Sequence, residues 1–457
     1  MTIRRLLIAN RGEIATRIIR TCRRLGIETV LAASAADRDS LPARLADRTL
    51  CIGPSRASES YLNVGAIVHA AVAVDADAIH PGYGFLSERP VLAKACEEQG
   101  VIFIGPTPAQ IECAGDKLRA RAHAEAAGVP VIPGGAVGSA ADGIAVARRI
   151  GLPVLVKAVG GGGGRGMKRV ERIEELPGAI QLAESEAGAA FGDARIYIER
   201  FVTGGRHVEV QVLGDGRGGV VHLGERDCSI QRRYQKLIEE TPAPRLSHPF
   251  RQRLHEAAVR FAAAMSYRGA GTVEFLVDPN CDGFYFLEMN ARIQVEHPVT
   301  EAVTGVDLIA EQIAIAAGRG LRLGQAAICP RGSAIECRVN AEDPARDFQP
   351  SPGRVSAVRW PAGDGIRVDT HIESGAWVSP FYDSLMAKII AHGEGREAAL
   401  ERMWQAIAAA RIQGVASNLA LHSTVLASRE FQEGGVDTGF LVRLLERAPM
   451  LVEARLG

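Results

Sequence analysis

Three features that would point at once to a partner are missing from this sequence. Lys plus Arg number 53 and Asp plus Glu also 53, so the formal net charge is zero. This balance gives no overall attraction to a polyanion, and we expect no nucleic-acid partner. No apolar run reaches the roughly 20 residues that cross a bilayer. The N-terminal MTIRRLLIANRGE passes into a charged turn, unlike a signal peptide. We therefore expect no membrane partner.

Paired cysteine motifs are also missing. The eight cysteines, at positions 22, 51, 96, 113, 228, 281, 329 and 337, show neither CxxC pairs nor the spacing of a zinc site. In a chain of 457 residues they are too few for a disulfide framework. The sequence therefore predicts a cytoplasmic protein in a reducing compartment. At this length we expect two to four structural units.

The N-terminal segment alternates strand and helix but lacks the glycine pattern of a dinucleotide site. Residues 4 to 33 predict a strand, a turn at Gly12, an amphipathic helix and a second strand, with Ile14, Ile18, Ile19 and Cys22 on one side of the helix. GxGxxG is absent, so dinucleotide binding is not indicated. HPGYGFLSE at 80–88 follows a strand end, where open α/β sheets bind ligands, although a tight turn explains it equally well. VIFIGP at 101–106 closes this unit.

A glycine tract follows, in LPVLVKAVGGGGGRGMKRV at 152–170. Lys157 and Arg165 stand on either side of five consecutive glycines, between two β-rich runs. A flexible linker is the alternative. The GK[ST] of a Walker A loop is absent and no helix follows. Because backbone N–H groups without side chains can lie on phosphates, we predict a mobile phosphate-covering flap at 160–166.

A β-hairpin with metal-binding side chains is predicted further along. TVEFLVD and FYFLE are separated by the turn PNCDG. Residues two apart in a strand share a face, so Glu288 and Asn290 point the same way, and the partner strand brings Glu274 beside them. Hard oxygen ligands suit Mg²⁺ or Mn²⁺. A solvated strand edge is the alternative, but the alternation with Met289 favours one buried face and one face turned to a cavity.

The polar run continues beyond the hairpin. If the chain stays extended after Asn290, then Arg292, Gln294 and Glu296 lie on the same face as the metal ligands. The arrangement suits a phosphorylated anion. Upstream, residues 223–244 carry Arg232, Arg233 and Lys236, and their position just before the hairpin favours an anion site over a solvated basic face.

The C-terminal part is predicted to form a further unit. RGSAIECRVNAED at 331–343 predicts a strand in which Arg338 faces away from Cys337 and Val339. The segments that follow predict a small β-rich module covered by a helix at about 397–411.

Six motifs, taken in order, resemble those of one enzyme family. They are IANRGEIA, HPGYGFLSE, VKAVGGGGGRGM, ERDCSIQRR, EMNARIQVEHPVTE and ECRVNAEDP. The chain resembles the biotin carboxylase component of biotin-dependent carboxylases from about residue 3 to 446. The resemblance implies an α/β protein with an ATP-grasp fold, an N-terminal Rossmann-like domain, a mobile lid and a C-terminal α+β domain. The implied divisions are 1–114, 115–330 with the lid at about 131–203, 331–446, and a tail at 447–457.

The resemblance also assigns residues by motif. ATP would be bound by Lys117, Lys157, Gly163, Gly164, Glu199, Arg200, Phe201, Val202, His207 and Tyr234, the last standing where many members have histidine. Two Mg²⁺ or Mn²⁺ ions would be held by Glu274, Glu288 and Asn290. Bicarbonate would be bound by Lys236, Arg292, Gln294 and Val295. Glu296 would be the general base, and Arg338 would stabilise the biotin enolate, so the implied catalytic residues are Arg292, Glu296, Arg338 and Lys236.

The implied reaction is ATP- and bicarbonate-dependent carboxylation of biotin through carboxyphosphate. MAK at 386–388 lies inside a predicted strand, and no other biotin-attachment tripeptide is present. We therefore expect biotin on a separate carrier protein, a carboxyltransferase partner and a homodimer. The final acceptor, an acyl-CoA or a keto acid, is not encoded here. The alternatives are another ATP-grasp ligase, which would share the flap and metal strand but not RIQVEHPVTE, and a non-catalytic scaffold, which intact metal, base and arginine positions argue against.

Overall fold

The N-terminal part of the chain folds around a parallel sheet. The computed structural model describes residues 2–160 and 167–447. The five strands lie in the order β3-β2-β1-β4-β5, and each neighbouring pair is parallel. They are β1 (Arg5–Ile8), β2 (Glu28–Ala33), β3 (Arg48–Cys51), β4 (Ala78–His80) and β5 (Ile102–Phe103). The helices of this part are α1 (Gly12–Leu25), α2 (Leu41–Leu45), α3 (Val64–Ala73) and α4 (Pro90–Glu98). The predicted strand–helix–strand unit is confirmed.

Helix α1 is more deeply buried than an amphipathic surface helix. Ile14, Ile18, Ile19 and Cys22 are buried, as their spacing predicts. Arg17 on the same helix is also buried, and its guanidinium lies 2.9 Å from Glu301 and 2.8 Å from Asp307. Part of the polar side of the helix is therefore enclosed by residues nearly 300 positions away, which local periodicity cannot reveal.

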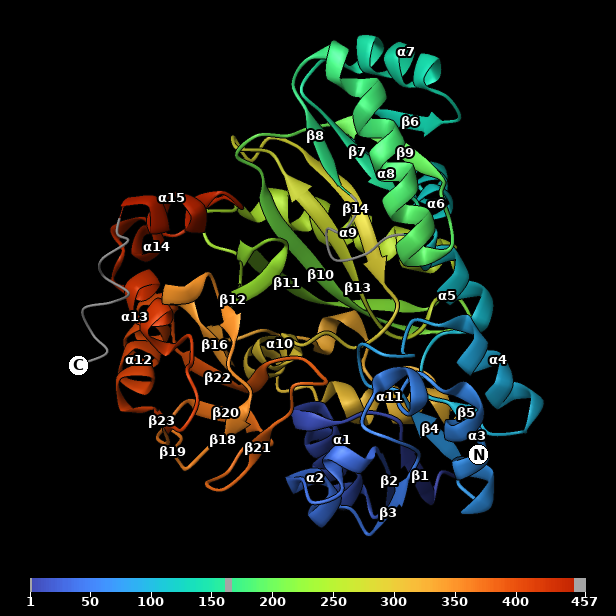
Figure 1. Ribbon diagram of the computed structural model, residues 1–457, viewed down its shortest axis with the longest axis vertical. Coiled ribbons are helices and arrows are strands. Elements are labelled where there is room, and N and C mark those ends of the chain that lie inside the picture. The colour runs from blue at the N-terminus through green and yellow to red at the C-terminus, as the bar shows by residue number, and fades with distance from the viewer. Residues whose placement is uncertain (1, 161–166, 448–457) are drawn as a thin grey trace.

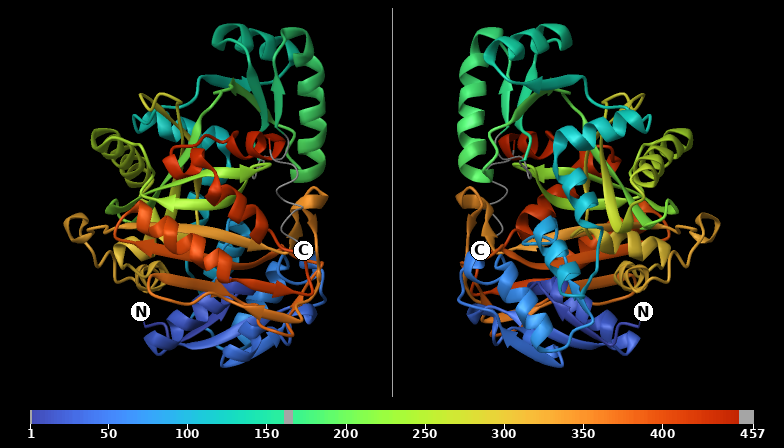
Figure 2. Two further views of the ribbon diagram at one scale, coloured as in Figure 1. Left: turned by 90° about the vertical axis from the view of Figure 1, so that its left-hand side faces the viewer. Right: turned by 90° about the vertical axis from the view of Figure 1, so that its right-hand side faces the viewer.

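A small antiparallel unit stands at the end of the molecule opposite the N-terminal sheet (Figures 1 and 2). We call it the lid. Its strands, in the order β6-β9-β7-β8, are β6 (Gly134–Val137), β7 (Val154–Ala158), β8 (Lys168–Val170) and β9 (Ile196–Arg200). The helices α7 (Ala140–Ile150) and α8 (Leu176–Phe191) cover it, and α5 (Pro108–Gly115) and α6 (Lys117–Ala126) precede it. Strands β7 and β8 flank the glycine tract as predicted, while Gly163, Gly164 and the rest of 161–166 lie outside the described residues.

An eight-stranded sheet forms the centre, in the order β14-β13-β10-β11-β12-β15-β22-β20, with antiparallel neighbours. Its strands are β10 (Arg206–Asp215), β11 (Val220–Arg232), β12 (Gln235–Thr241), β13 (Arg268–Val277), β14 (Phe284–Asn290), β15 (Ser333–Asn340), β20 (Ile366–Thr370) and β22 (Leu385–Gly393). The predicted hairpin is β13–β14. Strands β15, β20 and β22 continue the sheet of that hairpin, so the C-terminal β-rich segment is not a separate sheet.

The remaining elements surround this sheet. The helices are α9 (His248–Ala264), α10 (His297–Thr304), α11 (Leu308–Ala316), α12 (Arg396–Ala409), α13 (Leu419–Ala427), α14 (Arg429–Glu433) and α15 (Phe440–Arg447). Three short strand pairs are β16 (Glu342–Asp343) with β17 (Gln349–Pro350), β18 (Gly353–Arg354) with β21 (Trp377–Val378), and β19 (Ala357–Arg359) with β23 (Arg411–Gln413). Among the described residues, no helix combines the length and apolarity needed to span a bilayer. All eight cysteines are free thiols.

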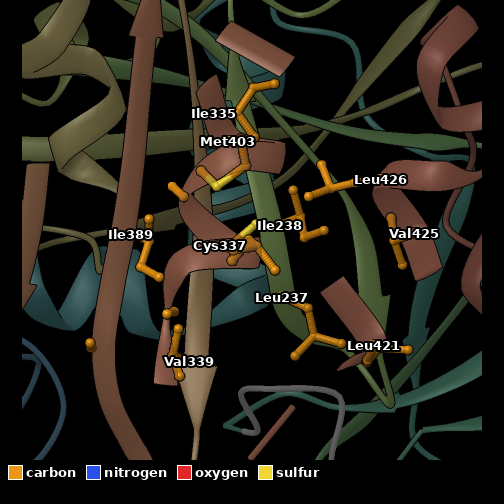
Figure 3. Close-up of a cluster of buried hydrophobic side chains, with 14 of the residues drawn as sticks. Leu237, Ile238, Ile335, Cys337, Val339, Ile389, Met403, Leu421, Val425 and Leu426 are labelled. Carbon is orange, nitrogen blue, oxygen red and sulfur yellow. The ribbon is translucent and has the colours of Figure 1, made fainter. Parts of the chain in front are cut away.

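The C-terminal half of the central sheet has two unlike faces. On one face Cys337, Val339 and Ile389 pack with α12 and α13 into a hydrophobic core (Figure 3). On the other face Arg338 of β15 and Lys388 of β22 lie directly opposite each other. Because successive side chains of a strand point to opposite faces, one short sequence supplies both the core and a row of charges. The predicted orientation of Arg338 is confirmed.

Because one face of the sheet forms the hydrophobic core, we expect Ile389→Ala to lower the free energy of unfolding much more than Val442→Ala. Ile389 is fully buried in this core. Replacing it with alanine removes three carbons from a packed interior and should lower the free energy of unfolding by about 2–5 kcal/mol. Val442 on α15 is 54% exposed, and Val442→Ala should change it by less than about 0.5 kcal/mol. Urea unfolding of the two variants beside the parent chain measures this, and equal losses would contradict it.

Candidate active site

One cavity of about 1390 Å³ is bounded by the N-terminal part, the lid and the central sheet. It collects nearly every described residue that the sequence singled out. Those lining it are Lys117, Lys157, Glu199, Arg200, Phe201, Val202, His207, Tyr234, Lys236, Glu274, Glu288, Asn290, Arg292, Gln294, Val295 and Arg338. Glu296 lies just behind them, bonded to two of their side chains.

Lys236 is the centre of the charge network in this cavity. Its ammonium group lies 2.5 Å from Glu209, 2.9 Å from Glu274 and 2.8 Å from Glu296. Burial lowers the pKa of this lysine, but the three carboxylates outweigh burial and raise the pKa well above its ordinary value. The lysine is therefore charged. Two groups of side chains around Glu209 lie close enough together to share a cation: His207, Glu209 and Glu274, and Glu209, Cys228 and Glu296. The cation that lies among their carboxylates is the ammonium group of Lys236.

Glu296 is fully buried and held by two cations. One carboxylate oxygen accepts from Lys236 at 2.8 Å, and the other accepts from Arg338 at 2.8 Å. Burial alone would raise the pKa of Glu296, but Lys236, Arg338 and Arg226 hold it well below the ordinary range. The carboxylate is thus ionised at neutral pH and able to accept a proton.

The hairpin brings oxygen ligands together as predicted. Glu274 and Glu288 are directly opposite each other in β13 and β14. The side-chain amide of Asn290 donates to Glu274 at 2.8 Å, and His207 lies 2.9 Å from the other oxygen of Glu274. Two carboxylates and an amide oxygen match the preference of Mg²⁺ or Mn²⁺ for hard ligands. These residues fit a divalent cation.

The prediction that the strand continues past Asn290 is wrong. Strand β14 ends at Asn290, residues 291–296 turn, and α10 begins at His297. Arg292 nevertheless stays in the site, because its guanidinium donates to Asn290 and to Gln294, each at 2.7 Å. Gln294 in turn donates to Glu274 at 3.1 Å. Side-chain hydrogen bonds, and not strand alternation, gather these residues.

Only one of the three basic residues at 232–236 reaches the charge network of the cavity, so the prediction of an anion site stays open for Lys236 alone. Arg233 lies 3.0 Å from Asp347, and Arg232 pairs with the same carboxylate while its guanidinium stacks on Phe348. Both arginines therefore face away from the cavity's charge network, towards a neighbouring turn. Lys236 alone enters that network. Tyr234, in the tight turn between β11 and β12, is 53% exposed at the cavity's edge.

Of the two lysines expected to meet a nucleotide, one is held within the lid and the other by the central sheet. Lys157 of β7 pairs with Glu199 of β9, and Lys117 lies 3.5 Å from Glu288. The backbone N–H groups of Arg200 and Phe201 donate to the carbonyls of Pro133 and Pro153, each at 2.9 Å. The segment 199–202 is thus fixed to the lid where it borders the cavity.

Besides Glu209, the partner of Lys236, three further residues of the site were not found from the sequence. Glu88, at the end of the HPGYGFLSE loop, accepts from Arg292 at 2.7 Å. Arg226 is completely buried and donates to Glu209 at 2.6 Å. Glu239 accepts from Arg338 at 2.6 Å, and burial raises the pKa of Glu239 to about 7. For Arg226 and Glu239 the sequence did carry a signal, because charged residues inside β-strand patterns indicate buried charges. Buried charges require partners, so such residues are expected to form a network.

Sequence models of three families match consecutive parts of the chain. They are "Biotin carboxylase, N-terminal domain" at residues 2–111, "Carbamoyl-phosphate synthase L chain, ATP binding domain" at 116–324 and "Biotin carboxylase C-terminal domain" at 336–443. Among curated relatives, the biotin carboxylase of Nostoc sp. is 49% identical over 443 residues, covering 96% of this chain and 99% of the relative. A pyruvate carboxylase component of Methanothermobacter thermautotrophicus is 47% identical, with 96% and 89% covered.

Solved structures agree with these matches. The biotin carboxylase domain dimer of the Hydrogenobacter thermophilus 2-oxoglutarate carboxylase, solved with MgADP, ADP and bicarbonate, has a TM-score of 0.94 and 43% identity, with 99% of each chain covered. The Campylobacter jejuni biotin carboxylase has a TM-score of 0.94 and 46% identity, with 97% and 99% covered. Fold and site thus define an ATP-grasp ligase, and the fold class predicted from the sequence is confirmed. The chain belongs to the biotin carboxylase family and is an ATP-dependent carboxylase of the ligase class.

The surroundings of Arg338 predict an acid-sensitive contact. His422 of α13 is fully buried and lies 2.7 Å from the carbonyl oxygen of Arg338. Burial lowers the pKa of His422 from 6.5 to about 4, so the unfolded chain takes up this proton first. The stability that His422 contributes above pH 6.5 is therefore lost as the pH falls towards 4. Glutamine keeps an N–H donor but does not titrate.

Between pH 7 and pH 5, the parent chain should lose about 2 kcal/mol more unfolding free energy than His422→Gln. Urea unfolding at the two pH values measures the difference. The control is His69→Gln, on the exposed side of α3, which should leave the pH dependence of the parent unchanged. Parallel pH profiles for the parent and His422→Gln would refute the assignment.

Proposed function

We propose that this chain carboxylates biotin carried on a separate protein, with ATP and bicarbonate as the other substrates and carboxyphosphate as the intermediate. The observation that carries the proposal is that Glu296 is held between two cationic side chains. An ionised, buried carboxylate between Lys236 and Arg338 is a base beside two cationic groups, in a cavity that also holds an oxygen-ligand set. The bicarbonate and MgADP in the Hydrogenobacter relative support the same substrates.

The nucleotide and metal assignments of the described residues rest on position in the cavity. Lys117, Lys157, Glu199 to Val202, His207 and Tyr234 would bind ATP, and the sequence motif alone adds Gly163 and Gly164 to this set. Glu274, Glu288 and Asn290 would hold two Mg²⁺ or Mn²⁺ ions, which offset charge on the phosphates when bound. The oxygen-rich hairpin supports this choice of cation.

In the first step, bicarbonate would lie between Lys236, Arg292, Gln294 and the backbone of Val295. Glu296 takes its proton, and the resulting oxyanion attacks the γ-phosphorus of ATP. The bond to ADP breaks, and carboxyphosphate forms. Arg292 is suited to orienting the anion because Glu88, Asn290 and Gln294 fix its guanidinium.

In the second step, carboxyphosphate divides into carbon dioxide and phosphate. The phosphate removes the N1 proton of biotin, and N1 then attacks carbon dioxide to give carboxybiotin. Negative charge develops meanwhile on the ureido oxygen of biotin, and Arg338 stabilises it. Glu239 helps to fix that guanidinium by accepting from its Nε, while Glu296 accepts from Nη2.

The assembly we propose is a cytoplasmic homodimer that works with a biotin carboxyl carrier protein and a carboxyltransferase. The relatives include a dimeric domain and a component of pyruvate carboxylase, which supports a multi-component enzyme. The partner transferase would choose the acceptor, an acyl-CoA or a keto acid. We keep the divisions 1–114, 115–330, 331–446 and 447–457, with the lid at about 131–203.

Phosphate release from ATP tests the reaction. With Mg²⁺, release should depend on bicarbonate and rise when free biotin is added. Release that requires an amine and a carboxylate substrate instead would identify a different ATP-grasp ligase. No release under any of these conditions would identify a non-catalytic protein, and either result would refute the proposal.

Substitutions at Glu296 and Arg338 should separate the two steps. Glu296→Gln removes the base, so ATP cleavage and carboxybiotin formation should fall together by about 10²- to 10⁴-fold. Arg338→Gln should reduce carboxybiotin formation at least about tenfold more than ATP cleavage, because the biotin enolate loses its partner. Phosphate and carboxybiotin are measured side by side in each variant. Equal losses of both rates in Arg338→Gln would assign this arginine to the first step.

A further inference from the structure

Lys388 is a buried cation beside the active site to which the proposed mechanism gives no role. It is fully buried in β22. Its ammonium group donates to the backbone carbonyl of Val295 at 2.8 Å and lies 3.1 Å from Glu13 of α1. A buried ammonium group needs hydrogen-bond partners, and these two contacts supply them.

His297 makes a matching contact one peptide unit earlier. It is fully buried, and its Nδ1 lies 2.7 Å from the carbonyl oxygen of Gln294. A carbonyl can only accept, so Nδ1 carries the hydrogen. Burial, helped by Lys388 and Arg17, holds the pKa of His297 well below its ordinary value, and the ring is neutral.

The His297 contact fixes the direction of the Val295 N–H group, and the Lys388 contact fixes the peptide unit that follows it. The peptide bond between Gln294 and Val295 is trans, as only Leu152–Pro153 and Thr241–Pro242 are cis in the described chain. In a trans peptide the C=O and N–H bonds point to opposite sides. Because His297 holds the Gln294 carbonyl on its own side, the Val295 N–H points away from α10, and Val295 lines the cavity. Within the described residues, nothing accepts this N–H.

We propose that Lys388 and His297 are positioning residues that hold two successive peptide units so that the Val295 N–H is aimed at bicarbonate. The inference rests on the proposed function, which places bicarbonate at Val295. Neither side chain touches the substrate. Each acts through a backbone carbonyl. Together they fix the orientation of the backbone, as Arg338 fixes the orientation of the Glu296 side chain.

The cross-strand register supports a role in the active site beyond general stability. Arg338 and Lys388 are opposite residues of β15 and β22, and they hold the consecutive residues Glu296 and Val295. The counter-ion Glu13 comes from the N-terminal part, where Tyr83, a cavity residue, also donates to it. Lys388 thus ties the turn at 291–296 to both neighbouring parts of the protein.

The test is the KM for bicarbonate in bicarbonate-dependent ATP cleavage. Lys388→Met keeps the unbranched side chain up to the terminal ammonium group and removes that charge and donor. Loss of a charged hydrogen bond should raise this KM about ten- to a hundredfold, while the KM for ATP stays within about twofold. If the single variant does not fold, because Glu13 is then a lone buried charge, Lys388→Met with Glu13→Gln removes both charges and should show the same rise.

His297 offers a second, independent arm. His297→Leu should raise the KM for bicarbonate about two- to tenfold. His297→Asn places an amide N–H where Nδ1 was and should restore the parent value. If the KM for bicarbonate is raised equally in His297→Leu and His297→Asn, the orienting role of His297 is contradicted.

Arg396→Met is the matched control. Arg396 forms an ion pair of 2.6 Å with Glu240 and holds the carbonyls of Phe431 and Gln432, away from the cavity. It should lower thermal stability without changing the KM for bicarbonate. If Lys388→Met or its double variant keeps the parent KM, or shifts the KM for bicarbonate and ATP by the same factor as the control does, the inference is overturned. Absence of bicarbonate dependence in the parent chain would instead overturn the proposed function, and this inference with it.

Discussion

The ammonium group of Lys236 is the charge on which the rest of the site depends. Glu209, Glu274 and Glu296 are buried within reach of one another, and each would be driven to its neutral form by burial and mutual repulsion. One lysine, delivered by β12 to the middle of the group, keeps Glu274 and Glu296 ionised. Arg226 completes the balance from behind Glu209. The carboxylates proposed as metal ligand and as general base can therefore both stay charged in one cavity.

The alternation of one sheet keeps this charge away from the hydrophobic core. In β15, Cys337 and Val339 face α12 and α13, while Arg338 faces the cavity. In β22, Ile389 packs in the same hydrophobic core, and Lys388 lies on the opposite face of the sheet beside Arg338. A shift of register by one residue would exchange the two faces and place Arg338 and Lys388 in the core, so hydrophobic burial fixes the orientation of these two charges. Stability and chemistry are specified by the same strands.

The sequence predicted the parts of the site that local patterns determine. Strand alternation and the PNCDG turn were sufficient to place Glu274 opposite Glu288, because hairpin pairing involves residues close in the chain. The same rule failed after Asn290, where long-range bonds such as Arg292 to Glu88 decide the path of the backbone. Arg232 and Lys236 have similar sequence surroundings, yet Asp347, more than 100 residues later, draws only the first away. Partners from distant segments leave no periodic signal.

The charge balance also connects the two proposed steps. Lys236 has three N–H donors and three carboxylate acceptors, so an anion that binds to it must take the place of one of them. Under the proposed mechanism, Glu296 is the acceptor that would change, since taking the proton of bicarbonate would remove its negative charge. Its attraction to both Lys236 and Arg338 would then weaken. Lys236 would be able to hold the new carboxyphosphate more strongly, and Arg338 would be free to meet the ureido oxygen of biotin. The base proposed for the first step would thus release the arginine that the proposed second step requires.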